Sequence, residues 1–142
     1  MASNPLSPCS EIVTHSSVVV SERGKTVAFL NADQKEFCRL RVDGCAIKVG
    51  PRADYVVSKV GSISVVIELK GSDVGHAVDQ LFATVANEAI AEYLEVRQRL
   101  LIVCAEYPSF DTKIAKAQVR ARKGGMTLKV VCKSFECDIE QI

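Results

Sequence analysis

Short apolar segments bounded by turn residues fill the first half of the chain, and segments of this length predict β-strands. The predicted strands are residues 12–20, 25–30, 37–42, 45–49, 55–59 and 63–70. Turns join them at Glu22-Arg23-Gly24, at Asp43-Gly44 and near Val60-Gly61. Asp-Gly between two such segments is a strong hairpin signal. A competing interpretation makes residues 32–43 a helix, and a short helical turn at 33–37 is compatible with the hairpin.

Helical spacing replaces the strand pattern after the strand at 63–70. Apolar residues recur every three or four positions from Val74 to about residue 95, which predicts an amphipathic helix with Ser72 as its N-cap. Residues 100–105 then form a continuous apolar run, as in a strand that is covered on both faces.

A second helix is expected at residues 112–123, capped by Asp111 and stopped by Gly124-Gly125, with a last strand at 126–135. The order of elements is therefore strands, hairpin, helix, strand, helix, strand. This order predicts an α/β fold with a mixed sheet and helices packed on its faces.

Length and composition predict one soluble domain at residues 11–142 behind a disordered leader at 1–10. The start lacks a signal-peptide pattern, and no apolar run reaches the roughly 18 residues that a membrane span needs. Six cysteines lie mostly among apolar residues and none forms C-x-x-C, so we expect reduced thiols in a cytoplasmic protein. A zinc site from Cys132, Cys137 and a histidine is the minor alternative.

Charge is distributed unevenly, although the formal net charge is only +1. Residues 55–95 hold two cations and six anions, whereas residues 112–135 hold seven cations and no anion. Lys113, Lys116, Arg120 and Lys123 share one face of the second predicted helix. An acidic middle beside a basic section suits a metal site next to a phosphate-binding surface, although solvated helix faces give the same pattern.

The apolar strand at 63–70 ends in two charged side chains. Glu68 and Lys70 are two residues apart and point to the same face of the strand. Burying such charges costs free energy unless they are paired or bound. A turn near Val60-Gly61 brings Asp54 opposite Ile67 or Glu68, so that two carboxylates come within reach of one metal ion.

Asp54 followed by Glu68-Leu69-Lys70 on the second strand of a hairpin, then by a helix and an apolar strand, resembles the PD-(D/E)XK nuclease superfamily. The resemblance implies a restriction-endonuclease-like fold and cleavage of nucleic acid that depends on Mg²⁺ or Mn²⁺. It implies that Asp54, Glu68 and the Leu69 carbonyl hold the metal and that Lys70 orients water or neutralises charge. Gln80 matches a glutamine near the site in some members. Glu36 is the candidate for an additional acid from an N-terminal helix.

Two functions compete on these grounds. The first is a metal-dependent nuclease, endo- or exonucleolytic, with DNA expected in preference to RNA and the basic helix holding the phosphate backbone. The second is a non-catalytic nucleic-acid-binding or scaffold subunit on the same fold, within a larger DNA-processing or defence complex. A homodimer is expected where both strands are cut. Catalysis by cysteine lacks support, because no cysteine is spaced from a histidine as a known motif requires.

Overall fold

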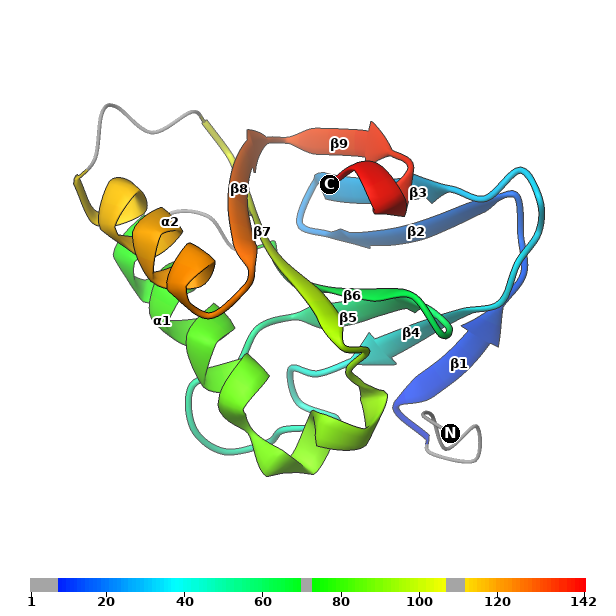
Figure 1. The fold of residues 1–142 in the computed structure, drawn as a ribbon, viewed down its shortest axis with the longest axis horizontal. Helices are drawn as coiled ribbons and strands as arrows, with labels where there is room; N and C mark the ends of the chain where they lie inside the picture. Colours follow the sequence, from blue (N-terminus) through cyan, green and yellow to red (C-terminus); the bar gives the residue numbers. More distant parts are fainter. Residues whose placement is uncertain (1–7, 70–72, 107–111) are drawn as a thin grey trace.

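The structure is a computed structural model of the chain, and it describes residues 8–69, 73–106 and 112–142. Two sheets and a layer of helices make up these residues (Figure 1). The large sheet has strand order β1-β4-β5-β6-β7-β8 and the small sheet has order β2-β3-β9. The elements are β1 (Ser10–Val13), β2 (Ser17–Glu22), β3 (Lys25–Leu30), β4 (Phe37–Arg41), β5 (Tyr55–Lys59), β6 (Ile63–Glu68), α1 (Val74–Ala86), the 3-10 segment η1 (Glu88–Tyr93), β7 (Arg97–Cys104), α2 (Thr112–Lys123), β8 (Thr127–Cys132), β9 (Ser134–Cys137) and the 3-10 segment η2 (Ile139–Gln141).

The large sheet is mixed. Its strands from β1 to β6 pair antiparallel, whereas β6, β7 and β8 pair parallel. Parallel neighbours need crossovers, and α1 and α2 supply them. The predicted α/β class with a mixed sheet is therefore confirmed. In the described residues, helices α1 and α2 cover one face, and the small sheet, rather than another helix, covers the other (Figure 1).

Strand β6 shows why the sequence at this point is almost wholly apolar. Side chains alternate between faces, so Val66 packs in the core beneath the helices while Val65 and Ile67 pack in the core against the small sheet. All six residues of β6 are buried. The hairpin of β5 and β6 and the doubly covered strand β7 agree with the predictions from the sequence.

The predicted hairpin at Asp43-Gly44 is wrong. Residues 45–49 form turns, because the Ile47 and Cys45 amides both donate back to the Val42 carbonyl at 3.0 and 3.2 Å. Strand β4 pairs instead with β1 on one side and β5 on the other. The competing helix at 32–43 is also wrong, since Phe37–Arg41 is strand and residues 32–33 form only a turn.

Three other predicted elements change at their boundaries. The strand at 12–20 is two strands in different sheets, and the strand at 126–135 divides at Lys133, whose φ is 59°. Helix α1 ends at Ala86 rather than near residue 95, because Asn87 starts the separate segment η1. Its N-cap is Asp73, whose carboxylate accepts from the His76 amide at 3.1 Å. The predicted caps Ser72 and Asp111 lie outside the described residues.

The prediction of six reduced thiols is wrong for two of them. Cys9 and Cys45 form a disulfide that ties the start of β1 to the loop after β4. Cys38 and Cys104 are free and buried, as expected of packing residues. Cys132 and Cys137 are free and half-buried. Because disulfides are rare in reducing compartments, this bond argues against the predicted cytoplasmic location, which stays a prediction.

No helix in the described parts of the chain is long and apolar enough to cross a membrane. The single domain at 11–142 stays a prediction, and most of the predicted leader lies outside the described residues.

Candidate functional site

The two predicted carboxylates lie at the open end of the β5–β6 hairpin. The paired register of β5 and β6 ends with Tyr55 opposite Ile67, and Asp54 and Glu68 are the next residues along the chain at this end. The Asp54 amide donates to the Ile67 carbonyl at 3.0 Å, and the Leu69 amide donates to Asp54 Oδ2 at 2.7 Å. Of the two residues expected opposite Asp54, Ile67 is therefore the one that it bonds, and an alignment with Glu68 stays a prediction.

Both carboxylates are buried, each only 1% exposed. Asp54 is also held by the turn that follows β4, because its carbonyl accepts from the Val42 amide at 2.9 Å. Buried carboxylates must be balanced by a cation or by hydrogen bonds. Lys70, the predicted cation, lies outside the described residues. The Leu69 amide satisfies part of this requirement, and a metal-binding role for the Leu69 carbonyl stays a prediction.

Two further acids approach Asp54. Oxygens of Glu22, Asp43 and Asp54 all lie within 4.8 Å of one another. Glu22 ends β2, Asp43 follows β4, and Asp54 precedes β5. These acids line a hollow of about 190 Å³, here called the acidic hollow, together with Arg41 and Tyr55.

Asp54 lies between two acidic environments. Glu68 is two residues from Val66 along β6 and therefore points toward the helix side of the sheet. Tyr55, which lines the acidic hollow, packs instead against the core of the small sheet. Glu68 is not a member of the close group of three acids. Asp54 is therefore within reach of a cation shared with Glu22 and Asp43, and a cation shared with Glu68 stays a prediction.

Glu22 and Asp43 were missed from the sequence because each has the pattern of a turn residue. Both start predicted turns, and both lie far from Asp54 along the chain. Only the packing of the small sheet on the large one brings Glu22 to β5. The Cys9–Cys45 disulfide and the bond from Arg52 Nε to Asp43 Oδ1, at 2.8 Å, fix the loop that carries Asp43. The single available signal was an acid at the end of a strand, which is common and unspecific.

Glu36, the predicted additional acid, is not brought to this site. It is exposed just before β4, and its carbonyl accepts from the Val60 amide at 3.0 Å. Arg41, at the other end of β4, pairs with Tyr55 beside Asp54. A strand rises about 3.3 Å per residue, so Glu36 lies about 17 Å along the strand from that end. The helix that was expected to carry Glu36 is a turn and an extended segment.

Gln80 lies on the face of α1 that packs against the sheet, where it is buried. Its carbonyl accepts from Thr84 Oγ1 at 2.7 Å, and that hydroxyl oxygen in turn accepts from the Ala53 amide at 2.7 Å. Thr84 thus connects α1 to the residue before Asp54. The predicted role of Gln80 in catalysis stays a prediction, and Thr84 is a positioning residue that the sequence did not reveal.

Three of the four predicted basic residues on α2 line a common groove with α1. Lys113, Lys116 and Arg120 line this groove of about 540 Å³, here called the basic groove, whereas Lys123 does not. Two acids from the start of α1, Asp73 and Asp79, line its other side. Gly75 makes room for Lys113, because a Cβ at Gly75 would lie 3.2 Å from Lys113 Cδ. The Arg120 guanidinium lies 3.9 Å from the centroid of the Phe82 ring. Since α1 starts at Val74, shortly after Glu68, the basic groove lies at the same edge of the sheet as the acids.

Three of the free thiols in the described residues have a raised pKa. Burial, with a smaller contribution from the charge of Glu95, raises the pKa of Cys38 to about 11. Burial also raises the pKa of Cys104 and of Cys137. Because the thiolate is the nucleophile, these three cysteines are poor candidates for nucleophilic catalysis at neutral pH.

No protein-family model, no curated protein and no solved structure matches this chain. Function must therefore be inferred from the site.

Proposed function

We propose that this protein is a divalent-metal-dependent phosphodiesterase that cleaves nucleic acid. The observation that carries the proposal is that two buried carboxylates, Asp54 and Glu68, lie at the open end of the β5–β6 hairpin, with two further acids close to Asp54. Buried carboxylates are stabilised by hydrogen bonds or by a bound cation, and the proposal assigns such a cation as Mg²⁺ or Mn²⁺. The resemblance of Asp54 and Glu68-Leu69-Lys70 to the PD-(D/E)XK motif supports the same proposal, as does the order of hairpin, helix, parallel strand and helix.

The side chains at this edge fit Mg²⁺ or Mn²⁺ chemically. Such hard cations prefer carboxylate and carbonyl oxygens, and Asp54, Glu68, Glu22 and Asp43 provide only oxygen donors. A bound cation would supply charge to the phosphate and lower the pKa of a water molecule. Asp54 is pre-positioned for metal binding, because its backbone and Oδ2 are held by Val42, Ile67 and Leu69.

The remaining roles belong to cations of the chain. Lys70 is proposed to orient the attacking water or to neutralise the developing negative charge. Lys113, Lys116 and Arg120 of the basic groove are proposed to hold phosphates of the backbone, which would make binding weaken with salt. DNA is the proposed substrate in preference to RNA, and a homodimer or a larger assembly stays a prediction.

Cleavage assays with metal test this proposal. DNA and RNA, in single-stranded, duplex and branched forms, are incubated with the protein and Mg²⁺ or Mn²⁺. Glu68→Gln, Asp54→Asn and Lys70→Ala should each lower the rate by about 100-fold or more, since even residues that only support metal ligands are worth 10- to 100-fold. Glu92→Gln, an exposed acid on η1, is the matched control and should cleave normally. Cleavage by Glu68→Gln at the wild-type rate would refute the proposal.

The basic groove favours a second candidate function, because it needs no metal to bind phosphates. A non-catalytic nucleic-acid-binding subunit would bind oligonucleotides equally well with and without Mn²⁺ and would cleave none. Calorimetric titration with Mn²⁺ separates the two functions, since only the nuclease requires metal binding that Asp54→Asn removes.

A further inference from the structure

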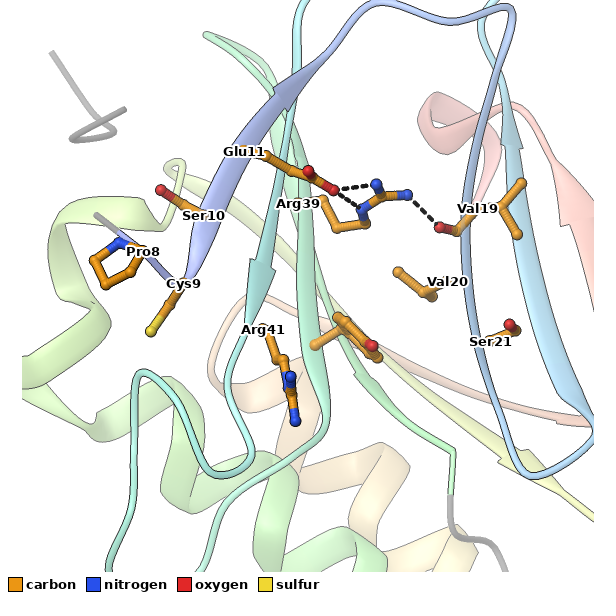
Figure 2. A pocket seen from close by; sticks show the side chains of 10 residues that line it. Pro8, Cys9, Ser10, Glu11, Val19, Val20, Ser21, Arg39 and Arg41 are labelled. Atoms are coloured by element: carbon orange, nitrogen blue, oxygen red, sulfur yellow. Dashed lines mark hydrogen bonds and ion pairs between the residues drawn. The ribbon is translucent and has the colours of Figure 1, made fainter. Parts of the chain in front are cut away.

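A second groove leads to the acidic hollow. It has a volume of about 410 Å³ and lies between β2 and the strands β1 and β4 of the large sheet (Figure 2). Arg39, Arg41, Tyr55 and Ser21 are among the residues that line it. Arg41 and Tyr55 also line the acidic hollow, so the two spaces share a wall. We call this space the strand groove.

The two arginines of the strand groove are in different states. Arg39 is fully engaged, because its guanidinium binds the Glu11 carboxylate and Nη1 donates to the Val19 carbonyl at 2.6 Å. This arginine therefore fastens β2 to the large sheet. Arg41 is exposed, and no hydrogen bond or ion pair joins its side chain to another residue in the described parts of the chain. Figure 2 shows the Arg41 side chain extending away from the Glu11–Arg39 pair.

Tyr55 gives the strand groove an aromatic surface beside this cation. Arg41 and Tyr55 are directly opposite in the β4–β5 ladder, so their Cβ atoms are about 5 Å apart on one face. Tyr55 is half-buried against the core of the small sheet, which holds its ring in place. A guanidinium that retains all its donors binds phosphate, and an aromatic ring stacks a nucleobase.

The geometry points to a binding site for single-stranded nucleic acid in the strand groove, with Arg41 holding a phosphate and Tyr55 stacking the adjoining base. A volume of about 410 Å³ is within the range of small-ligand sites and suits one nucleotide. A duplex keeps its bases stacked inside and presents no base face to Tyr55. The hollow beyond is recessed, since Asp54 is 1% exposed, and a flexible single strand reaches it more readily than a rigid duplex.

This inference rests on the proposed function and specifies that the substrate is single-stranded. Binding in the strand groove itself requires no metal. Binding is therefore measured in EDTA, by fluorescence anisotropy of labelled oligothymidine, oligouridine and a DNA hairpin duplex. We expect the single strands to bind more tightly than the duplex. Arg41→Ala should weaken single-strand binding about fivefold or more and lower the slope against log salt by about 0.7. Arg122→Ala, which removes an equal charge from an exposed site on α2, is the control.

Tyr55 is tested by two substitutions. Tyr55→Phe keeps the ring and should bind as wild type, whereas Tyr55→Leu should weaken binding about fivefold or more because the base can no longer stack. Tighter binding of the duplex, or equal loss in Arg41→Ala and Arg122→Ala, would overturn the inference. The relative affinities of oligothymidine and oligouridine distinguish DNA from RNA as the source of the strand. A protein that binds single strands through Arg41 but cleaves nothing with Mn²⁺ would refute the nuclease and leave this site standing.

Discussion

The two ends of the β5–β6 hairpin handle charge in opposite ways. At the turn end, Glu140 is surrounded by partners: it accepts from Arg97 Nη1 at 2.9 Å, from the Ser62 hydroxyl, and lies 3.6 Å from Lys59 Nζ. At the open end, three carboxylates lie within 4.8 Å of one another, and Glu68 ends β6 at the same end of the hairpin.

The difference separates a structural use of charge from a functional one. One carboxylate among several donors stabilises the turn end by itself. Several carboxylates together repel one another; Arg52 balances Asp43, and a bound cation is proposed to stabilise the others. The two ends should therefore respond differently to reduction, metal, salt and pH.

Breaking the Cys9–Cys45 disulfide should have the largest effect on the free energy of unfolding. The bond spans 36 residues, and the loop-entropy relation then gives a loss of about 4 kcal/mol. Urea denaturation of Cys45→Ser, compared with wild type with and without a thiol reductant, measures it. Cys132→Ser, which removes a free half-buried thiol, should change little. Six titratable thiols in the unreduced, denatured wild type would contradict the disulfide itself.

Metal should stabilise the open end alone. At Mn²⁺ concentrations 100 times the dissociation constant, binding to the folded state raises the free energy of unfolding by about 2.7 kcal/mol. Asp54→Asn should abolish this gain, and Glu140→Gln should leave it intact. Glu68→Gln and Asp43→Asn then show which neighbour shares the ion with Asp54. A gain that survives in Asp54→Asn would contradict a metal site at this end.

The basic groove provides a further test of the difference between the two ends of the hairpin, because its cations lie at the open end. Lys116→Ala should lower the slope of log affinity against log salt by about 0.7 to 0.9 for each phosphate that the side chain no longer binds. Arg122 lies on a different face of α2, so Arg122→Ala should leave the slope unchanged. Oligonucleotide binding at several salt concentrations measures both slopes, and equal slopes for the two variants would remove the basic groove from the proposal.

Local pattern was enough to predict the elements around Asp54 and Glu68, because a doubly buried strand and a hairpin leave strong signals over few residues. Lys25–Leu30 and Thr112–Lys123 were likewise predicted with their observed bounds. The loop after β4 was not, since its shape depends on the bond between Cys9 and Cys45, which are distant in the chain. Tertiary contacts overrode the Asp-Gly signal there.

The candidate site was predictable to the same extent. Asp54 and Glu68 were found because one hairpin contains both. Glu22 and Arg41 line the site only because β2 packs against the large sheet. No spacing of residues along the chain predicts that packing. The prediction for Glu36 was wrong because the family resemblance implied an N-terminal helix at this point. The structure has a turn followed by β4 there.

The smallest expected effect is at the turn end and concerns pH. The hydrogen bond from Ser62, with the bond and charge of Arg97, lowers the pKa of Glu140 from its ordinary value of 4.5. A carboxyl whose folded pKa is lowered stabilises the protein above its unfolded pKa, and this contribution is lost as pH falls through the folded pKa.

Glu140→Gln should therefore lower the free energy of unfolding at pH 7, by about 1 kcal/mol or less for a partly exposed pair, and should leave it unchanged at pH 2. Urea denaturation at both pH values measures the difference. Glu136→Gln, an exposed acid on β9, is the control. A loss for Glu140→Gln that is equal at pH 7 and pH 2 would mean that packing, rather than charge, holds the turn end, and the contrast between the two ends would then lose its electrostatic basis.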